Sequence, residues 1–516
     1  MSRLRFFLHS VASSYVSLAS NLIYSVASVP LALHFITKQE FGLWALMFQI
    51  TSYLVVIDFG MSPAVSRLLI EEKDRPDSGA YGSLIQTAVL VNLVQGLLIL
   101  AAGLLLAPSF ANLLRIPTEL RPQFDILVRY QCAIAGATFA VRVFRNILYA
   151  HQRNDIINHM QAVVFLAQLG VFYAALKAQS GVYSILWMNA FALVFSVSAN
   201  CWNCLRLRLL PPRHAWGRPV WSRFKELFMY SKDVFVVHLG SILIMTSQSV
   251  IVSRTMGLVA VAAWAVGTKA FAFLSQLIYQ FYDYSEPAFS EMIVRGEKER
   301  LRARFSGILV VSEVIGTIAA VIYASCNSTF VTVWTAGKIS WSGWNDVLLD
   351  CWLIVTVVVH ADSCFTVLTK RIGFMRYVYL LEGLVFVIVA SLAAPRGGFP
   401  AIIGTSILCS ACFTGPYGIK RINAYFGFHF PELELRWLAT AVRVAGIMIL
   451  TALVLWYIGQ RFSPIPRLVL NAVALGPLGL VLFLRYGTTR EMRVEVLGHV
   501  PRFFQPVLAP LLGADK

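Results

Sequence analysis

Polar and charged side chains form one row along the otherwise apolar stretch 260–292. The members of this row recur at intervals of 4, 3, 4 and 3 residues, which puts them on one face of a helix: Lys269, Phe273, Gln276, Gln280 and Asp283. Packing between membrane helices rarely requires such a set, whereas the wall of a hydrated cavity does. An amine in that wall could neutralise a phosphate, and a carboxylate could carry a proton.

Lys269 is the strongest single candidate in this row. It lies about nine residues, or roughly 13 Å by helical rise, from the outer end of its stretch. A lysine near the end of a span can extend its amine to the surface, but from that depth the reach is harder. We therefore expect Lys269, with Gln276 and Gln280, to contact the substrate.

Four carboxylates inside apolar stretches are candidates for coupling transport to an ion: Asp58, Asp283, Glu313 and Glu382. Asp58 is the single carboxylate between the ends of the apolar stretch 40–69. An ionisable group inside a span costs roughly 2.5 to 3.5 kcal/mol, so Asp58 must face protein or water rather than lipid. Glu313 and Glu382 could carry protons, pair with arginines or stay protonated, and the sequence favours none of these roles.

Two further stretches have a polar side. In 10–36, six residues recur at intervals of 4, 3, 4, 3 and 4: Ser10, Ser14, Ser17, Asn21, Tyr24 and Ser28. The stretch 232–254 carries His238, Ser241 and Gln248 at the same kind of spacing. Small hydroxyl residues also let membrane helices pack closely. The row at 269–283 favours a shared cavity, so we expect it to be lined by Asn21, Tyr24, His238 and Gln248.

Two arginines share a face near the inner end of the stretch 125–148. Arg142 and Arg145 could grip a phosphate bidentately or simply follow the positive-inside rule. Arg129 lies off that face and near the outer surface. We include Arg142 and Arg145 among the substrate-binding candidates.

The composition places these rows inside a membrane. Hydrophobic residues make up 58% of the 516 residues and charged residues 13%, with a mean hydropathy of +0.69, which excludes an ordinary soluble domain. The first apolar run is too long for a signal-peptide core, so we expect it to stay in the protein. Apolar runs predict an all-α fold of fourteen spans, roughly 10–36, 41–67, 80–107, 125–148, 156–177, 182–205, 232–254, 260–288, 305–327, 347–369, 374–394, 399–419, 437–459 and 465–484.

The net charge of +17 is explained by the sidedness of a membrane protein. With a cytoplasmic N-terminus, 31 of the 43 Lys and Arg residues fall on the inner side, 9 on the outer side and 3 within spans. The positive-inside rule accounts for this bias. We therefore expect a multi-pass membrane protein with both termini in the cytoplasm, and no nucleic-acid partner.

A weak internal repeat divides the chain into two related halves, as in many transporters. Trp44 aligns with Trp264, and the PAVS of 63–66 aligns with the PAFS of 287–290. We expect a six-helix bundle at 1–205, a basic linker at 206–231, a second six-helix bundle at 232–425, two further helices at 426–484 and a cytoplasmic tail at 485–516.

Cations alternate with aromatic residues in the linker: Arg213, Arg218, Arg223 and Lys225 with Trp216, Trp221 and Phe224. The linker either lies in the lipid headgroup region or is a solvated connector. The eight cysteines lie mostly in apolar segments, so we assign them to packing and expect no metal site. We also expect no cofactor, and no GxxxxGK[ST] phosphate loop occurs that would indicate ATP hydrolysis.

Three segments carry a resemblance to a known family. They are FGLW at 41–44 followed by DFGMSPAVSRLL at 58–69, FRNILYAHQRNDIINHMQAVVFLAQ at 144–168, and SKDVFVVHLGSILIMTSQSVIVSRTMG at 231–257. The chain to about residue 421 resembles the bacterial oligosaccharide flippases, the Wzx-type polysaccharide transporters. The resemblance implies the fold of the multidrug/oligosaccharidyl-lipid/polysaccharide (MOP) exporter superfamily: two pseudo-symmetric six-helix bundles and alternating access.

The same resemblance implies a cargo of polyprenyl-diphosphate-linked oligosaccharide, moved from the inner to the outer leaflet. Expected partners are this substrate, membrane lipids, and a glycan polymerase or chain-length regulator, with the protein itself a monomer. One rival function is an ion-coupled multidrug or cation exporter of the same superfamily, whose cavity should favour carboxylates. Another is a glycan polymerase or ligase, which generally needs a larger outer region than the connection of about 20 residues found here.

Overall fold

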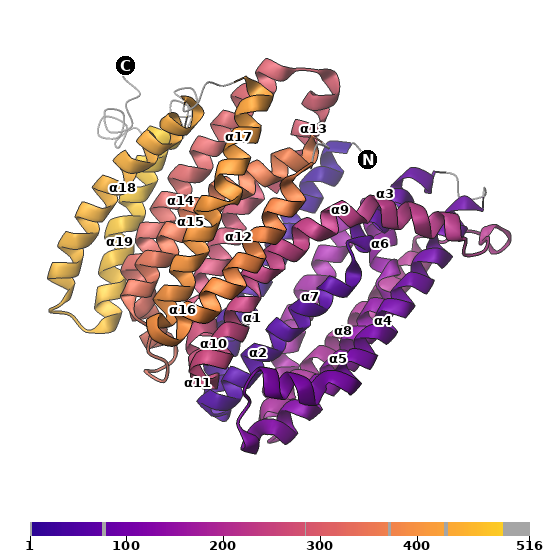
Figure 1. Cartoon of the computed structure of the whole chain (residues 1–516), viewed down its shortest axis with the longest axis horizontal. Helices are drawn as coiled ribbons and strands as arrows, with labels where there is room; N and C mark the ends of the chain where they lie inside the picture. Colours follow the sequence, from indigo (N-terminus) through magenta and orange to yellow (C-terminus); the bar gives the residue numbers. More distant parts are fainter. Residues whose placement is uncertain (1–2, 75–78, 284, 370–372, 428–431, 489–516) are drawn as a thin grey trace. The chain divides into compact units, whose positions relative to one another are not determined.

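The computed structural model describes residues 3–488, except 75–78, 284, 370–372 and 428–431. All regular elements in these described residues are helices (Figure 1). The predicted all-α fold is therefore confirmed. Most of the predicted cytoplasmic tail, from residue 489 onward, lies outside the described residues.

Two compact units make up the chain, residues 1–262 and 263–516. The helices that begin in the first unit are α1 (Arg3–Phe35), α2 (Lys38–Leu54), α3 (Met61–Glu72), α4 (Ala80–Leu113), α5 (Arg121–Val141), α6 (Val143–Ala150), α7 (Asn154–Lys177), α8 (Ser184–Arg206), α9 (Trp221–Met245), α10 (Ser247–Met256) and α11 (Leu258–Gly267). Those of the second are α12 (Lys269–Asp283), α13 (Glu286–Arg295), α14 (Lys298–Trp334), α15 (Gly343–Leu368), α16 (Met375–Cys412), α17 (Thr414–Phe426), α18 (Glu432–Gly459) and α19 (Pro464–Leu482).

The outer surfaces of both units are apolar. Leu105 on α4 is 75% exposed and Leu450 on α18 is 67% exposed, and similar side chains surround them along the same helices. In a water-soluble protein such a surface would drive association, whereas lipid tails cover it without cost. The exposed leucines thus agree with a chain that crosses the membrane many times.

Twelve described helical segments are long and apolar enough to span a bilayer, or thirteen with the bent pair Leu258–Gly267 and Lys269–Ile293. One of them, Met375–Phe426, contains two of the predicted spans. In α16, Ser410 Oγ donates a hydrogen bond of 2.8 Å to Glu382 Oε1, although the two residues are 28 apart in sequence. A straight helix would separate them by about 42 Å. The chain therefore turns back between them, at Gly398 with φ 58° and ψ −145°.

Five predicted spans are not continuous helices, which corrects the expectation for 41–67, 125–148, 232–254, 260–288 and 399–419. The first breaks after α2 into a 3-10 turn, Val55–Asp58, and left-handed residues Phe59 (φ 49°) and Gly60 (φ 68°) before α3 begins. The second breaks at Arg142 between α5 and α6, and 232–254 breaks at Thr246 between α9 and α10. The span 260–288 breaks at Thr268 between α11 and α12, and 399–419 at Phe413 between α16 and α17. Glycine meets the positive φ at residue 60 without strain.

The predicted basic linker forms a short irregular segment and the first turns of α9. Trp221 is 74% exposed and its ring stacks on Phe224 with centroids 4.8 Å apart. Arg223 pairs with Glu72 of α3 at 2.7 Å and with Glu226 at 3.0 Å. Burial acts to lower the pKa of Arg223, but hydrogen bonds and charge from Glu226 and Glu72 outweigh burial and raise the pKa. These pairs anchor the start of α9 to α3.

Close helix packing in the first unit depends on two glycines. A Cβ added to Gly96 of α4 would overlap the carbonyl oxygen of Gly136 in α5, and the reverse also holds. The two backbones therefore touch directly, as small residues allow in membrane bundles. No other residue type fits either position without moving a helix.

We predict that Gly96→Ala lowers the apparent melting temperature of the detergent-purified protein, because backbone overlap of this kind costs on the order of 1–3 kcal/mol. Gly170→Ala on α7 is the matched control, since no atom lies within 4 Å of a Cβ built there. The control should be neutral or slightly stabilising, because alanine favours the helix by about 1 kcal/mol over glycine. Equal melting temperatures for the two variants would contradict the direct contact.

Candidate functional site

A cavity of about 630 Å³ lies within the first unit. Among the described residues that line it, the charged ones are Arg142 and Arg145. Six carboxamide side chains also line it: Gln131, Asn146, Gln161, Gln168, Asn189 and Asn200. Hydroxyl groups come from Tyr24, Thr51, Ser62, Thr138 and Ser196. The cavity is therefore cationic and rich in groups that both donate and accept hydrogen bonds.

The break between α5 and α6 places the two arginines. Arg142 ends α5 and its guanidinium forms an ion pair with Asp58 Oδ1 at the break between α2 and α3. The same nitrogen donates to Gln95 Oε1 at 3.3 Å, and Gln95 Nε2 donates to the Asp58 backbone carbonyl at 3.0 Å. The other Asp58 oxygen, Oδ2, accepts the Ser62 backbone N–H at the start of α3 (3.3 Å). Asp58 thus neutralises Arg142 and also accepts a hydrogen bond from a backbone N–H that has no partner within its own helix.

Arg145 lies one turn further along, at the start of α6. Within the described part of the chain it has no acidic partner, and its side chain is exposed to the cavity. Arg142 is paired, so Arg145 supplies the uncompensated positive charge of the cavity wall. A guanidinium in that position can bind phosphate oxygens through two parallel hydrogen bonds.

Hydrogen bonds hold several of the carboxamides in place. Gln131 Nε2 donates to Thr51 Oγ1 at 3.3 Å, and Asn189 Nδ2 donates to Gln131 Oε1 at 3.0 Å. Ser62 Oγ donates to Asn146 Oδ1 at 3.4 Å. The walls contributed by α2, α5 and α8 are therefore joined by side-chain amides. Such fixed amides suit the hydroxyl groups of a sugar.

The structure brings together three of the predicted site residues in this cavity: Tyr24, Arg142 and Arg145. Asp58 lies behind Arg142 as its ion-pair partner. Asn21 is half-buried on α1, His238 is exposed on α9 and Gln248 is buried on α10, and none of the three is among the residues that line this cavity. Their predicted contact with substrate stays a prediction.

Sequence reasoning missed the carboxamides, although their spacing carried a signal. Gln161 and Gln168 lie two helical turns apart on α7, and Asn189 and Asn200 on α8 are separated by three turns, with Ser196 between them on the same face. Each pair is polar and sits within an apolar stretch. This is the same pattern that identified the row at 269–283.

In the second unit, the break before α12 positions Lys269. The Gly267 carbonyl, freed by the break, accepts hydrogen bonds from Tyr323 Oη and Asn327 Nδ2, both at 3.0 Å. Asp346 Oδ1 accepts from Asn327 Nδ2 and from Trp341 Nε1, both at 2.7 Å. Lys269 then begins α12 as a half-buried side chain. A cation at a helix N-terminus is electrostatically unfavourable, so an anion near it is favoured.

The rest of the row on α12 is more exposed than buried. Gln276 and Asp283 are exposed and Gln280 is half-buried. Phe273 instead lines an apolar groove of about 740 Å³ with side chains of α14 and α19. The row on α12 therefore has a polar side and an apolar edge.

Two buried carboxylates lie near each other, one on α14 and one on α15. Glu313 is fully buried, and in the described residues both of its carboxyl oxygens lack a hydrogen-bond partner. Asp362, which is 4% exposed and was not predicted, is close enough to act on Glu313 electrostatically. Two such groups favour a shared proton or a bound cation. Glu382, by contrast, is hydrogen-bonded to Ser410.

We predict that Arg142→Ala destabilises the protein by on the order of 3 kcal/mol, because it leaves the Asp58 carboxylate without its counter-charge. The double variant Asp58→Ala/Arg142→Ala should melt closer to the wild type than Arg142→Ala does. Apparent melting temperatures of the wild type, Asp58→Ala, Arg142→Ala and the double variant, all in one detergent, measure this coupling. Strictly additive losses would show that the two side chains do not stabilise each other.

Comparison with known proteins agrees with a transport fold. A lipid II flippase, MurJ, in an inward closed conformation is 12% identical, with a TM-score of 0.63 over 93% of this chain and 99% of its own. An inward-facing multidrug resistance transporter of the MATE family, described as part of the MOP superfamily, is 12% identical, with a TM-score of 0.65 over 80% of this chain and 98% of its own. The MATE transporter VcmN of Vibrio cholerae, in its bent form, is 13% identical, with a TM-score of 0.53 over 82% of this chain and 99% of its own.

These structural likenesses establish the fold. No curated protein matches the sequence. The family model described as "Polysaccharide biosynthesis protein" matches residues 15–341, which is more than half of the chain. The chain therefore belongs to this polysaccharide biosynthesis protein family and has the fold of the MOP-superfamily transporters.

Proposed function

We propose that this protein is a flippase that moves a polyprenyl-diphosphate-linked oligosaccharide from the inner to the outer leaflet of the bacterial inner membrane by alternating access. The glycan would serve O-antigen, capsule or exopolysaccharide synthesis. The observation that carries the proposal is the cavity of the first unit, whose charged lining consists of two arginines, one of them unpaired. Its surroundings are amides and hydroxyls.

The chemistry of the cavity fits the two ends of such a head group. The diphosphate is anionic and, once removed from water, needs arginine or lysine to compensate its charge. The carboxamides match the donors and acceptors of sugar hydroxyls. At about 630 Å³ the cavity is within the usual range for bound small molecules, so it suits a head group while the polyprenyl chain stays in lipid.

The same cavity argues against a MATE-like exporter of cations. Organic cations would call for carboxylates in the wall, and Arg145 would repel them. The likeness to the MurJ structure extends over 93% of the chain, against 80% for the MATE transporter quoted above. We assign the protein no catalytic activity, neither as a polymerase nor as a ligase.

In this proposal the second unit contributes an anion site and the groups that couple transport to an ion. Lys269, with Gln276 and Gln280, would receive the head group during the transport cycle. Glu313 with Asp362 would bind a proton or another cation as the energy source, because both are buried and Asp362 acts electrostatically on Glu313. Asp58, Asp283 and Glu382 remain coupling candidates of lower rank, since each already has a polar partner.

The proposal also includes the arrangement of the chain in the cell. Both termini would be cytoplasmic, and the bundles would follow the boundaries expected from the sequence. The exposed Trp221 and the neighbouring cations would lie in the headgroups of anionic lipid. The protein would act as a monomer that hands its cargo to a glycan polymerase or chain-length regulator.

Deleting the gene tests this function. We predict that polyprenyl-diphosphate glycan accumulates at single-repeat length and faces the cytoplasm, with none polymerised outside. Radiolabelled lipid extracts, probed in intact cells with a membrane-impermeant periodate or lectin, report the leaflet. A lost polymerase would instead leave single units on the outer face, and a lost drug exporter would leave the lipid-linked glycan pool unchanged and sensitise cells to organic cations. Either result in a strain without a second flippase would overturn the proposal.

We predict that Arg145→Ala reduces glycan export at least tenfold at matched protein level, because a charged hydrogen bond of about 1.5–3 kcal/mol is lost. Arg145→Lys should retain part of the export, since it keeps the charge but not the bidentate geometry. Arg129→Ala is the control, because Arg129 is exposed on the neighbouring α5 and does not line the cavity. Export by Arg145→Ala equal to that of the control would exclude Arg145 from the binding site.

A further inference from the structure

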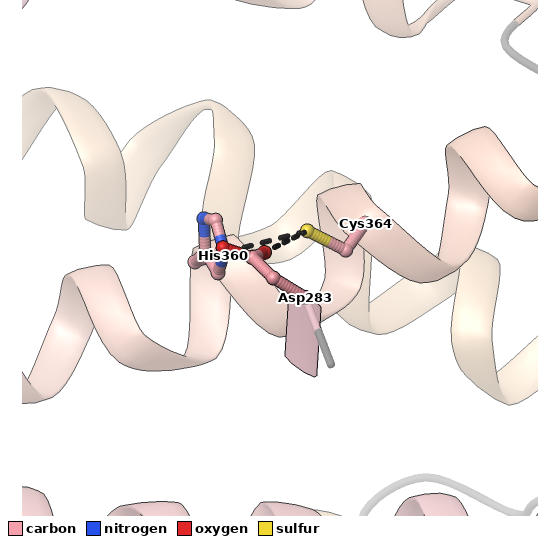
Figure 2. A group of neighbouring side chains, drawn as sticks. All are labelled: Asp283, His360 and Cys364. Atoms are coloured by element: carbon pink, nitrogen blue, oxygen red, sulfur yellow. Dashed lines mark hydrogen bonds and ion pairs between the residues drawn. The ribbon is translucent and has the colours of Figure 1, made fainter. Parts of the chain in front are cut away.

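Three side chains with metal-binding atoms meet between α12 and α15 in the second unit. Figure 2 shows Asp283, at the end of α12, directed toward His360 and Cys364 of α15. One ligand atom from each residue lies within 4.8 Å of the other two. None of the three residues lines the cavity of the first unit.

The distances match those of ligands around one metal ion. His360 Nε2 is 3.2 Å from Asp283 Oδ1 and 3.4 Å from Cys364 Sγ, and Cys364 Sγ is 3.9 Å from Asp283 Oδ1. Around a tetrahedral zinc ion, two such ligand atoms are roughly 3.3 to 3.6 Å apart. Small side-chain rotations would bring all three atoms into coordination distance.

The arrangement differs from a catalytic triad. In a triad the acid binds one ring nitrogen of histidine and the nucleophile binds the other. Here both Asp283 and Cys364 approach the same nitrogen, Nε2 of His360. Three groups that converge on one point are arranged to bind an ion placed there, not to relay a proton through the ring.

Neighbouring side chains fix the orientation of the ligands, and the ligands remain accessible to an ion from solvent. The ring of Tyr279 stacks on His360 with centroids 3.9 Å apart and an interplanar angle of 12°, which fixes the imidazole plane. The Asp283 side chain is 51% exposed and that of His360 is 25% exposed, so an ion can enter. Glu286, on α13, acts electrostatically on Asp283, His360 and Cys364, and its negative charge favours a cation beside them.

We propose that Asp283, His360 and Cys364 form a binding site for a divalent transition-metal ion such as Zn²⁺ or Co²⁺. Nitrogen and sulfur ligands select these ions over Na⁺ or Mg²⁺, which prefer oxygen alone. As the metal–sulfur bond forms, the Cys364 thiol releases its proton to solvent. The ion would bridge α12, which carries the polar row, to α15. The expectation that all cysteines serve packing would then fail for Cys364.

Titration of the metal-depleted, full-length protein with Co²⁺ in detergent tests the site directly, without a transport assay. We expect one Co²⁺ per chain and the charge-transfer absorption of a cobalt–thiolate bond, both reversed by Zn²⁺. Cys364→Ser should abolish the thiolate band, and Asp283→Asn and His360→Ala should weaken binding by at least tenfold. Absence of the band in the wild-type protein would overturn the proposal.

Cys351→Ser is the matched control, because Cys351 is an exposed cysteine on the same helix α15. This variant should keep the band and the affinity of the wild type. Zn²⁺ should raise the melting temperature of the wild type and of Cys351→Ser but not of Cys364→Ser, since only the native fold holds the site together. A band that survives in Cys364→Ser, or disappears in Cys351→Ser, would place the metal elsewhere.

Discussion

Backbone hydrogen bonding inside lipid is the constraint on which this structure depends. A helix that breaks within the membrane frees N–H and C=O groups that lipid cannot satisfy, so other parts of the protein must do so. At one break, Asp58 accepts the backbone N–H of Ser62 in the first turn of α3, and Gln95 donates to the Asp58 carbonyl. At another, Tyr323 and Asn327 donate to Gly267. These two breaks are thus stabilised by polar side chains from other helices.

These polar groups also determine which cationic side chain in each unit is available to bind an anion. Arg142 is needed to neutralise Asp58, so its neighbour Arg145, one turn away, is left with a free charge facing the cavity. In the second unit the network around Gly267 sets the first residue of α12, which is the lysine. The breaks therefore do more than interrupt helices, because they position one cation in each unit where a continuous helix would not.

Hydropathy and helical period predicted most of the fold. A bilayer requires long apolar segments with helical spacing, and both features can be read locally along the sequence. They also indicated Tyr24, Arg142 and Arg145, which the structure places along one cavity, while their contact with a substrate stays a prediction. The break at 58–60 could have been predicted from the Asp-Phe-Gly turn. The partners that stabilise each break could not, since Tyr323 is 56 residues from Gly267. Likewise Asp283 and His360 are 77 residues apart, and only folding brings them together.

The turn at Gly398 has a consequence for how the chain enters the membrane during synthesis. Each arm of this hairpin carries a polar group, and the partner of Glu382 is Ser410 in the other arm. If the first arm entered alone, Glu382 would have to be inserted without a hydrogen-bond acceptor or donor beside it. Insertion of both arms together lets the pair form at once. The short turn, with Pro395 and Pro400 on either side of it, makes residues 375–426 a single unit of biogenesis.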